Sequence, residues 1–316
     1  MPADDVVRTL QKVTAALPGG GEDRPGQVAM AEAVAGAIER ERHLVVQAGT
    51  GTGKSLAYAV PAALSGRTVV VATATKALQD QLATKDLPSV AAALDRPLDV
   101  AVLKGRSNYL CLQRAGEVAG DGHQQSLDQQ PGETGHLVDQ VRRLLRWGGE
   151  TDSGDRGELD FEPDGRAWAM VSVGPRECPG AARCPSGDRC FAERARRRAA
   201  DADVVVVNTH LYGAHLASGG TVLPPHDVVV FDEAHEVEEV MTASLGVDLP
   251  PGRLSALHTA ARPLVGDAAG LDLDGVAERL RGLLADRIGE RVLRGAPAGS
   301  VGSVAAAGSG PEERER

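Results

Sequence analysis

The sequence predicts an α/β protein: a parallel β-sheet with helices on both faces, interrupted by an insert that carries every cysteine. Short runs that are apolar throughout alternate with helical patterns, and strands buried on both faces have this composition. The pattern breaks after Gly105, where the chain becomes rich in Gly and Asp, and it resumes near residue 203. The expected strands are His43–Gln47, Thr68–Thr73, Asp99–Leu103, Asp203–Asn208 and Asp227–Phe231.

Apolar residues at helical spacing occupy the segments between these runs. Pro25 suits the first turn of a helix that continues to about Arg40, and another helix is expected from about Lys54. Helices are also expected over residues 4–17 and 76–85, inside the insert around Leu137–Leu145, and around Val276–Leu284. The expected domains are a discontinuous first domain (1–105 and 201–243), the insert (106–200), a helical region (244–293) and a disordered tail without periodicity (294–316).

Length and composition narrow the class of protein. The chain has 316 residues, of which 42% are apolar and 25% charged, as in globular proteins. The formal net charge of −10 excludes a globally basic nucleic-acid binder but not local basic patches. Four cysteines in a chain of this length do not make a disulfide scaffold. No signal-peptide pattern or transmembrane run is evident, so we expect a cytoplasmic protein with no membrane partner.

A Gly-rich loop lies between the first predicted strand and the helix expected from Lys54. Its last three residues match the phosphate-binding pattern G-x-x-x-x-G-K-S/T, while Ala48 stands in place of the first glycine. Small residues let backbone N–H groups surround phosphate oxygens, the lysine contacts the β- and γ-phosphates, and the Ser55 hydroxyl is a Mg²⁺ ligand. The alternative, a flexible Gly/Thr loop, does not explain the position between a strand and a helix. The predicted ATP-binding residues are Ala48, Gly49, Thr50, Gly51, Thr52, Gly53, Lys54 and Ser55.

The acidic sequence Asp232-Glu233-Ala234-His235 follows the last predicted strand. Open α/β sheets bind ligands at the carboxyl ends of their strands. We therefore expect Asp232 to hold Mg²⁺ through water and Glu233 to orient or deprotonate the attacking water. Alone, such a string is better explained by an acidic surface turn, but the upstream phosphate loop favours a catalytic role. The candidate catalytic residues are Lys54, Asp232, Glu233 and His235.

Two polar residues precede the phosphate loop by about one predicted helix. Gln27 could bind the edge of adenine through its amide, with Arg24 beside it. The other interpretation is an exposed glutamine in the first turn of a helix. The phosphate loop downstream favours nucleotide binding for both residues.

The four cysteines are candidates for a metal centre. Three of them lie close together, with five residues between neighbours and with Pro and Gly in the intervening loop. Zinc sites favour pairs separated by two to four residues, and no such pair occurs here, so the spacing favours a 4Fe–4S cluster over zinc. Four unrelated buried thiols would not explain why all of them fall in one insert. The candidate ligands are Cys111, Cys178, Cys184 and Cys190.

Together these motifs resemble the superfamily 2 DNA helicases of the XPD/DinG type, and bacterial DinG-like proteins in particular. The likeness covers about residues 20–240. Ala48 departs from the general phosphate-loop pattern but is tolerated in that family, which often has Glu at the position of Gln47. The stretches that carry the resemblance are Arg24–Gln27, Gln47–Ser55, Thr73–Leu82, Lys104–Cys111, Val207–Leu211 and Asp232–His235.

The resemblance implies a RecA-like ATP-binding domain in a motor that moves 5′ to 3′ along single-stranded DNA and opens forked duplexes, at the nucleoid, in repair or replication. It implies that the four cysteines hold a 4Fe–4S cluster. It also places Thr73, Thr75 and Gln81 near the DNA backbone, while the roles of Asn208 and His210 stay open. Arginines gathered in the insert suit phosphate contacts, although each alone is better explained by a solvated helix face: Arg142, Arg143, Arg146, Arg189, Arg194, Arg196, Arg197 and Arg198.

Helicases of this type need two RecA-like domains, and no second one is recognisable after His235. We therefore expect the ATP-binding half of a helicase, which alone binds ATP–Mg²⁺ weakly and hydrolyses it poorly. Two alternatives stay open. One is a non-catalytic iron–sulfur module that binds DNA or senses redox state, and the other is a zinc-stabilised ATPase unrelated to DNA. Strand-separation assays and metal content discriminate among them.

Overall fold

The computed structural model describes residues 2–17, 21–22, 24–49, 51–120, 133–246, 251–265 and 272–285. The chain forms two compact units, Met1–Gly246 and Val247–Arg316, and each is described by itself. The predicted tail over residues 294–316 lies outside the described residues.

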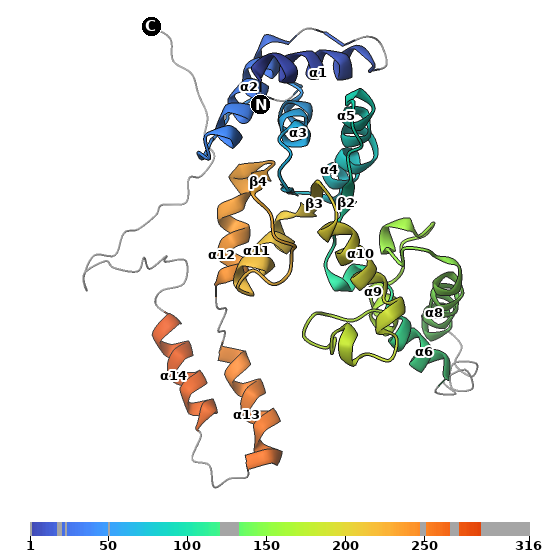
Figure 1. Cartoon of the computed structure of the whole chain (residues 1–316). Helices are drawn as coiled ribbons and strands as arrows, with labels where there is room; N and C mark the ends of the chain where they lie inside the picture. The colour runs from blue at the N-terminus through green and yellow to red at the C-terminus, as the bar shows by residue number, and fades with distance from the viewer. Residues whose placement is uncertain are drawn as a thin grey trace, which may run out of the picture. The chain divides into compact units, whose positions relative to one another are not determined.

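A parallel sheet of four strands lies at the centre of the first unit (Figure 1). The strands are β1 (Val69–Thr73), β2 (Val100–Val102), β3 (Val204–Asn208) and β4 (Val228–Phe231). Their order in the sheet is β2-β3-β1-β4. β1 pairs with β3 on one side and with β4 on the other, so that Val69 lies opposite both Val204 and Val228. The four strands predicted after the phosphate loop are therefore confirmed.

The two inner strands explain why helices cover both faces of this sheet. Val69 and Val71 of β1 join one apolar core, whereas Val70 and Ala72 join the other. β3 divides in the same alternating way, and its valines are fully buried. Valine suits such positions because a β-branched side chain packs well on a pleated surface.

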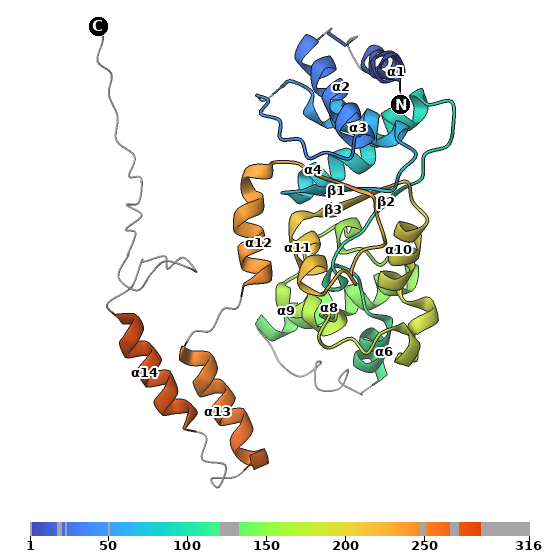
Figure 2. The same cartoon turned by 60° about the vertical axis from the view of Figure 1, so that its left-hand side comes forward.

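Helices from both halves of the first unit cover the sheet, as Figure 2 shows. One face carries α1 (Ala3–Ala15), α2 (Pro25–Glu39), α3 (Lys54–Leu64) and α5 (Leu87–Ala93). The other face carries α10 (Phe191–Ala200), α11 (Thr209–Ala217) and α12 (Val237–Leu245). The helix predicted over residues 76–85 is α4 (Lys76–Gln81), continued by a π-helical segment, η1 (Leu82–Asp86).

The strand predicted over His43–Gln47 is wrong. These residues adopt no regular structure, and among the described strands none pairs with them. Val45 is 91% exposed. An apolar, β-branched run favours a strand only when it finds a partner edge and burial. Here the backbone turns after α2 at Glu41, whose φ is 53°, and then runs outside the sheet to the phosphate loop.

The insert has a small apolar core of its own. Buried members include Leu110, Leu144, Trp168 and Phe191. The amphipathic helix predicted around Leu137–Leu145 is confirmed as α8. The elements of the insert before α10 are η2 (Arg106–Asn108), α6 (Leu112–Gly120), α8 (Glu133–Glu150), η3 (Arg156–Glu158), α9 (Gly165–Val171), η4 (Ala181–Arg183) and η5 (Gly187–Arg189).

One helix, α10, contributes to two of the three apolar cores of the first unit. The beginning of α10 places Phe191 and Ala192 in the core of the insert. Its end places Ala199 in the core on one face of the sheet. The insert is thus joined to the sheet by packing as well as by the chain.

The second unit contains a pair of helices, α13 (Pro251–Val265) and α14 (Leu273–Ala285), which pack against each other. α14 confirms the helical stripe predicted around Val276–Leu284. Nε2 of His258 lies 3.6 Å from Oδ2 of Asp274 across the pair. In the described parts of both units, no helix combines the length and apolarity that a membrane span requires.

Candidate active site

The phosphate loop leads into α3, which begins at Lys54. Gly51 and Gly53 have φ values of 78° and 76°, a left-handed conformation that glycine adopts without strain. The Thr52 hydroxyl donates to the Gly49 carbonyl at 2.9 Å. Ala48 is half-buried and Gly49 exposed, while Thr50 lies outside the described residues. Backbone N–H groups at the start of a helix are a ready-made site for an anion.

Two side chains from the start of α2 hold this loop. The Gln27 amide donates to the Gly53 carbonyl at 2.9 Å, and Arg24 Nη1 donates to the Gly51 carbonyl at 2.5 Å. Gln27 is only 4% exposed. The alternative interpretation, an exposed glutamine in the first helical turn, is therefore wrong, because the loop supplies a buried partner for its amide. A contact of Gln27 with adenine remains untested.

Asp232 stands at the carboxyl end of β4 and is 7% exposed. Its backbone N–H donates to the Ala72 carbonyl at 2.9 Å, which extends the pairing of β4 with β1. Each carboxylate oxygen has one donor. The Glu233 N–H donates to Oδ1 at 3.1 Å, and the Tyr58 hydroxyl donates to Oδ2 at 3.1 Å. The sequence analysis missed Tyr58, although its place four residues after Lys54 puts both on one face of α3.

Glu233 connects the acidic sequence to the phosphate loop. Its Oε1 lies 3.2 Å from Nζ of Lys54. Glu233 has a φ of 57° and precedes a short helical turn, η6 (Ala234–Glu236). Nδ1 of His235 lies 3.4 Å from Oε2 of Glu233, although the imidazole is 71% exposed. Lys54, Asp232, Glu233 and His235, which the sequence predicts as one group, are thus brought together.

Burial perturbs two further groups near this site. It raises the pKa of Tyr58, and the neighbouring Asp232 carboxylate raises it further, so the hydroxyl keeps its proton and donates it. Burial also raises the pKa of Asp86, at the end of η1, an effect that contacts with Gln81 and Ser55 oppose. Asp86 is a second site residue that the sequence analysis missed, because its only local signal is a carboxylate in a helical segment.

Three residues in the stretches that carry the resemblance, two of them expected near DNA, have local structural partners. The Thr75 hydroxyl accepts from Leu78 N–H at 3.2 Å and caps α4, and Asn208 Oδ1 accepts from Leu211 N–H at 2.7 Å and caps α11. The Gln81 amide donates to Asp86 Oδ2 at 3.2 Å. These contacts shape the carboxyl edge of the sheet and do not test a role in DNA binding.

The four cysteines are free thiols, and all of them are half-buried. Burial raises the pKa of the Cys111 thiol, and electrostatic interaction with Cys184 and Cys190 raises it further. Cys178 Sγ accepts from Arg106 Nη1 at 3.6 Å. Within the described residues, no three Cys, His, Asp or Glu side chains are arranged as a closed metal site. The donor set, four thiolates, has the chemistry that iron–sulfur clusters use.

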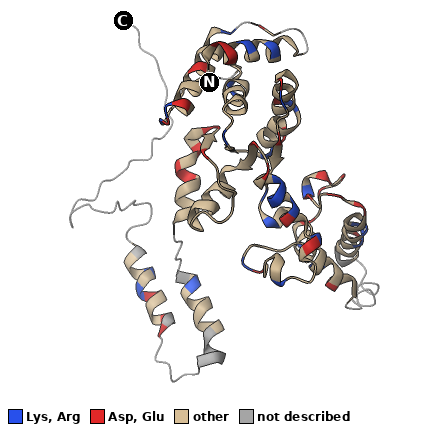
Figure 3. Cartoon of the chain, viewed as in Figure 1, with Lys and Arg blue, Asp and Glu red and all other residues tan. Residues whose placement is uncertain are grey.

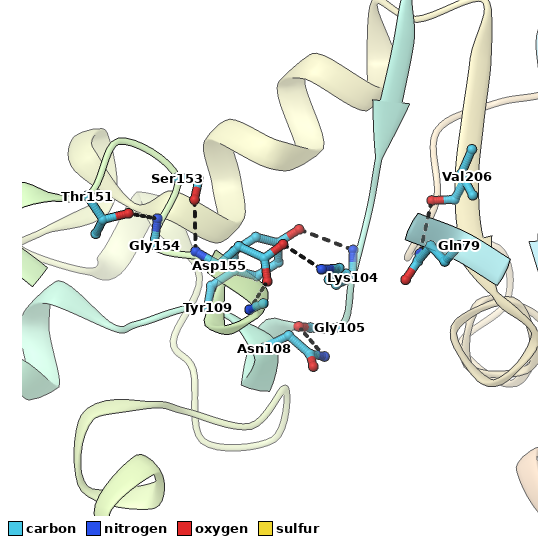
Figure 4. A network of polar contacts seen from close by, with 11 residues as sticks. Gln79, Lys104, Gly105, Asn108, Tyr109, Thr151, Ser153, Gly154, Asp155 and Val206 are labelled. Atoms are coloured by element: carbon cyan, nitrogen blue, oxygen red, sulfur yellow. Dashed lines mark hydrogen bonds and ion pairs between the residues drawn. The ribbon is translucent and has the colours of Figure 1, made fainter. Parts of the chain in front are cut away.

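A polar network joins the end of β2 to the start of the insert (Figure 4). Lys104, just after β2, pairs with Asp155 at 2.7 Å, and both side chains are less than 20% exposed. The Lys104 N–H also donates to the Tyr109 hydroxyl at 3.1 Å. Two residues after Tyr109, the Cys111 N–H donates to the Val171 carbonyl at 2.8 Å. The network therefore fixes the start of the insert to the end of β2.

Basic residues gather along α10, as Figure 3 shows. Arg197 and Arg198 are exposed, and the described residues provide no ion-pair partner for either. Arg194 instead donates to the Asp152 carbonyl, and burial lowers the pKa of Arg196. On α8, Arg143 pairs with an aspartate at 2.7 Å and lies over an aromatic ring. The insert therefore offers fewer unpaired cations than its composition suggests.

Part of the chain matches a known protein family. Residues 25–109, which include the phosphate loop and α3, match the DEAD/DEAH box helicase family. The remaining features of the site, Asp232 to His235 at the end of β4, lie beyond the matched residues but against the same loop. The class that this match indicates for residues 25–109 is a DEAD/DEAH box helicase.

Similarity to individual proteins narrows this class. The ATP-dependent helicase DinG of Mycobacterium tuberculosis is 46% identical over 248 residues, which are 74% of this chain and 37% of that protein. The ATP-dependent DNA helicase YoaA of Escherichia coli is 42% identical over 76% of this chain and 37% of its own length. The protein named 3′-5′ exonuclease DinG in Bacillus subtilis is 32% identical over 75% of this chain and 25% of its own length. This is a DinG-like helicase sequence that spans about 37% of the length of the first relatives it matches.

Proposed function

We propose that this chain supplies the ATP-binding motor domain of a DNA helicase that moves 5′ to 3′ along single-stranded DNA and opens forks. The observation that carries the proposal is the distance of 3.2 Å between Lys54 Nζ and Glu233 Oε1. It places the cation of a phosphate loop beside the carboxylate of a DEAH sequence 179 residues away in the chain. ATP hydrolysis at a sheet edge uses a cation that contacts the phosphates and a carboxylate that acts on water, and this distance puts both groups in one site.

The proposed reaction uses this pair in two ways. Lys54 would exchange Glu233 for the β- and γ-phosphates of ATP, which leaves the Glu233 carboxylate free to act on water. The water oxygen then attacks the γ-phosphorus, Glu233 accepts the proton, and the bond to ADP breaks. Backbone N–H groups from Gly49 to Gly53 would hold the phosphates, and Arg24 and Gln27 would lie on the adenine side.

Mg²⁺, which the family implies, would be held by the Ser55 hydroxyl and by Asp232 through water. These are hard oxygen donors of the kind that Mg²⁺ prefers. The metal, when bound, neutralises negative charge on the β- and γ-phosphate oxygens. The buried Asp232 carboxylate has one protein donor on each oxygen, so further lone pairs are available to a hydrated cation.

The insert supplies the second half of the proposal. We expect Cys111, Cys178, Cys184 and Cys190 to hold a 4Fe–4S cluster, which would link the root of the insert to the loop over residues 178–190. Exposed arginines of α10 would contact DNA phosphates at the nucleoid. Support for the cluster comes from the four half-buried free thiols, and support for a DNA contact comes from the name of the DNA helicase relative.

Nucleotide binding is the first test. A fluorescent ATP analogue in Mg²⁺ is titrated into the wild-type chain, into Lys54→Ala and into the control Lys12→Ala, which changes an exposed lysine of α1. Removal of a charged phosphate contact should weaken binding by roughly 10- to 100-fold for Lys54→Ala and leave Lys12→Ala unchanged. Equal affinities in all three proteins would contradict the proposed site.

Catalysis and the metal centre need separate measurements. We expect slow ATP hydrolysis by this chain alone, which spans about 37% of the length of the helicase relatives it matches. Robust DNA-stimulated hydrolysis would contradict that expectation. Anaerobic purification with iron and sulfide assays should give about four irons per chain, and Cys111→Ser should lose them. One zinc and no iron would remove the cluster from the proposal.

A further inference from the structure

One face of α3 contacts two consecutive acidic residues. Lys54 and Tyr58 are four residues apart, so their side chains lie one turn apart on the same side of the helix. Nζ of Lys54 lies 3.2 Å from Glu233, and the Tyr58 hydroxyl lies 3.1 Å from Asp232. The helix that starts at the phosphate loop therefore reaches the acidic sequence at two points.

The Asp232 carboxylate is fixed at both oxygens. Its own neighbour, the Glu233 N–H, holds Oδ1 at 3.1 Å, and Tyr58 holds Oδ2 from a different element. The backbone of Asp232 is fixed as well, because its N–H donates to β1. Only the Tyr58 hydroxyl restrains rotation of the carboxylate from outside the Asp232–Glu233 segment, among the contacts that the structure describes.

We propose that Tyr58 is a positioning residue for the metal–nucleotide complex: its hydroxyl fixes the plane of the Asp232 carboxylate and thereby sets the lone pairs that face a hydrated Mg²⁺. The inference rests on the proposed function, in which Asp232 holds the metal through water. Residues that orient metal ligands from outside the coordination shell change metal affinity by about 10- to 100-fold when removed.

A purely structural role for Tyr58 makes a different prediction. The side chain is 3% exposed and belongs to the apolar core beneath the helices of one face. If only its ring mattered, phenylalanine would replace it without effect. Tyr58→Phe keeps the ring and removes the hydroxyl, so it separates packing from positioning.

The test compares nucleotide affinity with and without metal. A fluorescent ATP analogue is titrated in Mg²⁺ and in EDTA. The dissociation constant in EDTA divided by the dissociation constant in Mg²⁺ gives the metal's contribution to nucleotide affinity. For Tyr58→Phe we expect that ratio to fall about 10-fold, with affinity in EDTA unchanged. Mn²⁺ binding to the same complex, followed by electron paramagnetic resonance, should weaken in parallel. The matched control is Tyr109→Phe, which removes a hydroxyl of similar burial, 4% exposed, at the root of the insert.

Each other outcome has a definite meaning. An unchanged ratio for Tyr58→Phe, with a wild-type chain that responds to Mg²⁺, overturns the positioning role and leaves the proposed function intact. A loss of affinity in EDTA that equals the loss in Mg²⁺ overturns it as well, since the hydroxyl then acts on the fold. A wild-type chain without any metal dependence contradicts the proposed function itself, and the inference falls with it.

Discussion

Replacing Gly53 by alanine tests how the phosphate loop is built. Gly53 has a φ of 76°, and a Cβ there would lie 2.1 Å from Nε2 of Gln27, the atom that donates to the Gly53 carbonyl. Gly51 is a matched control, because its φ is 78° but its Cβ position has nothing within 4 Å. Both substitutions strain the backbone, and only Gly53→Ala also displaces Gln27.

The magnitude follows from these two contributions. A left-handed conformation costs an alanine about 1–2 kcal/mol in either variant. Displacement of Gln27, which is 4% exposed, leaves a buried amide without its acceptor and adds about 1–3 kcal/mol. At about 2–4 °C per kcal/mol for a domain of this size, Gly53→Ala should lower Tm by roughly 2–12 °C more than Gly51→Ala.

Differential scanning calorimetry of both variants, alone and with Gln27→Ala, measures the difference. Once the glutamine is shortened, Gly53→Ala should cost no more than Gly51→Ala, because only backbone strain remains. Equal losses of Tm in the presence of Gln27 would refute the reasoning, since they would show that the amide does not resist the new Cβ.

Three further predictions concern the frame around the site. Lys104→Met leaves the buried Asp155 carboxylate unpaired and should lower the free energy of unfolding by about 1–3 kcal/mol in urea titrations. The control Arg114→Met breaks an exposed ion pair and should lower it by less than about 1 kcal/mol. Equal losses in the two variants would show that the buried pair does not stabilise the fold. The pKa of His215 is lowered by burial and by the neighbouring His226. The contribution of the neutral imidazole to stability is therefore intact above pH about 6.5 and is lost as the pH falls through the folded-state pKa. Tm measured from pH about 7.5 to 5.5 should fall less steeply in His215→Gln than in the wild type, and an identical slope would show that His215 does not cause the pH dependence. Asn208→Ala removes the cap of α11 and should cost about 1 kcal/mol, which Asn208→Asp should largely restore; no recovery in the aspartate variant would show that the cap is not the reason.

The sequence predicted the part of the site that depends on the order of strands and loops. Asp232 follows a run of apolar residues, and parallel strands bring their carboxyl ends to one edge. Lys54 begins a helix after a Gly-rich loop, and that position is dictated by local chemistry. Their proximity therefore followed from topology, before any side-chain contact was known.

The parts that the sequence did not predict depend on distant partners. Tyr58 contacts Asp232 across 174 residues of chain, and no local pattern identifies a tyrosine hydroxyl as its donor. Gln27 was predicted to contact adenine, and its partner in the structure, the Gly53 carbonyl, becomes available only once the loop has folded over it. The run His43–Gln47 has strand propensity, but propensity does not supply the neighbouring edge that a strand needs.

The shared helix α10 has a consequence for cooperativity. Phe191 completes the core of the insert and Ala199 completes the core on the sheet, roughly two helical turns apart. The core of the insert and the core on this face of the sheet both need α10 in order to form. Unfolding of either core would expose a buried side chain of the same helix. The insert and the ATP-binding sheet should therefore melt in one transition, and damage at the cysteines would reach the motor domain as lost stability.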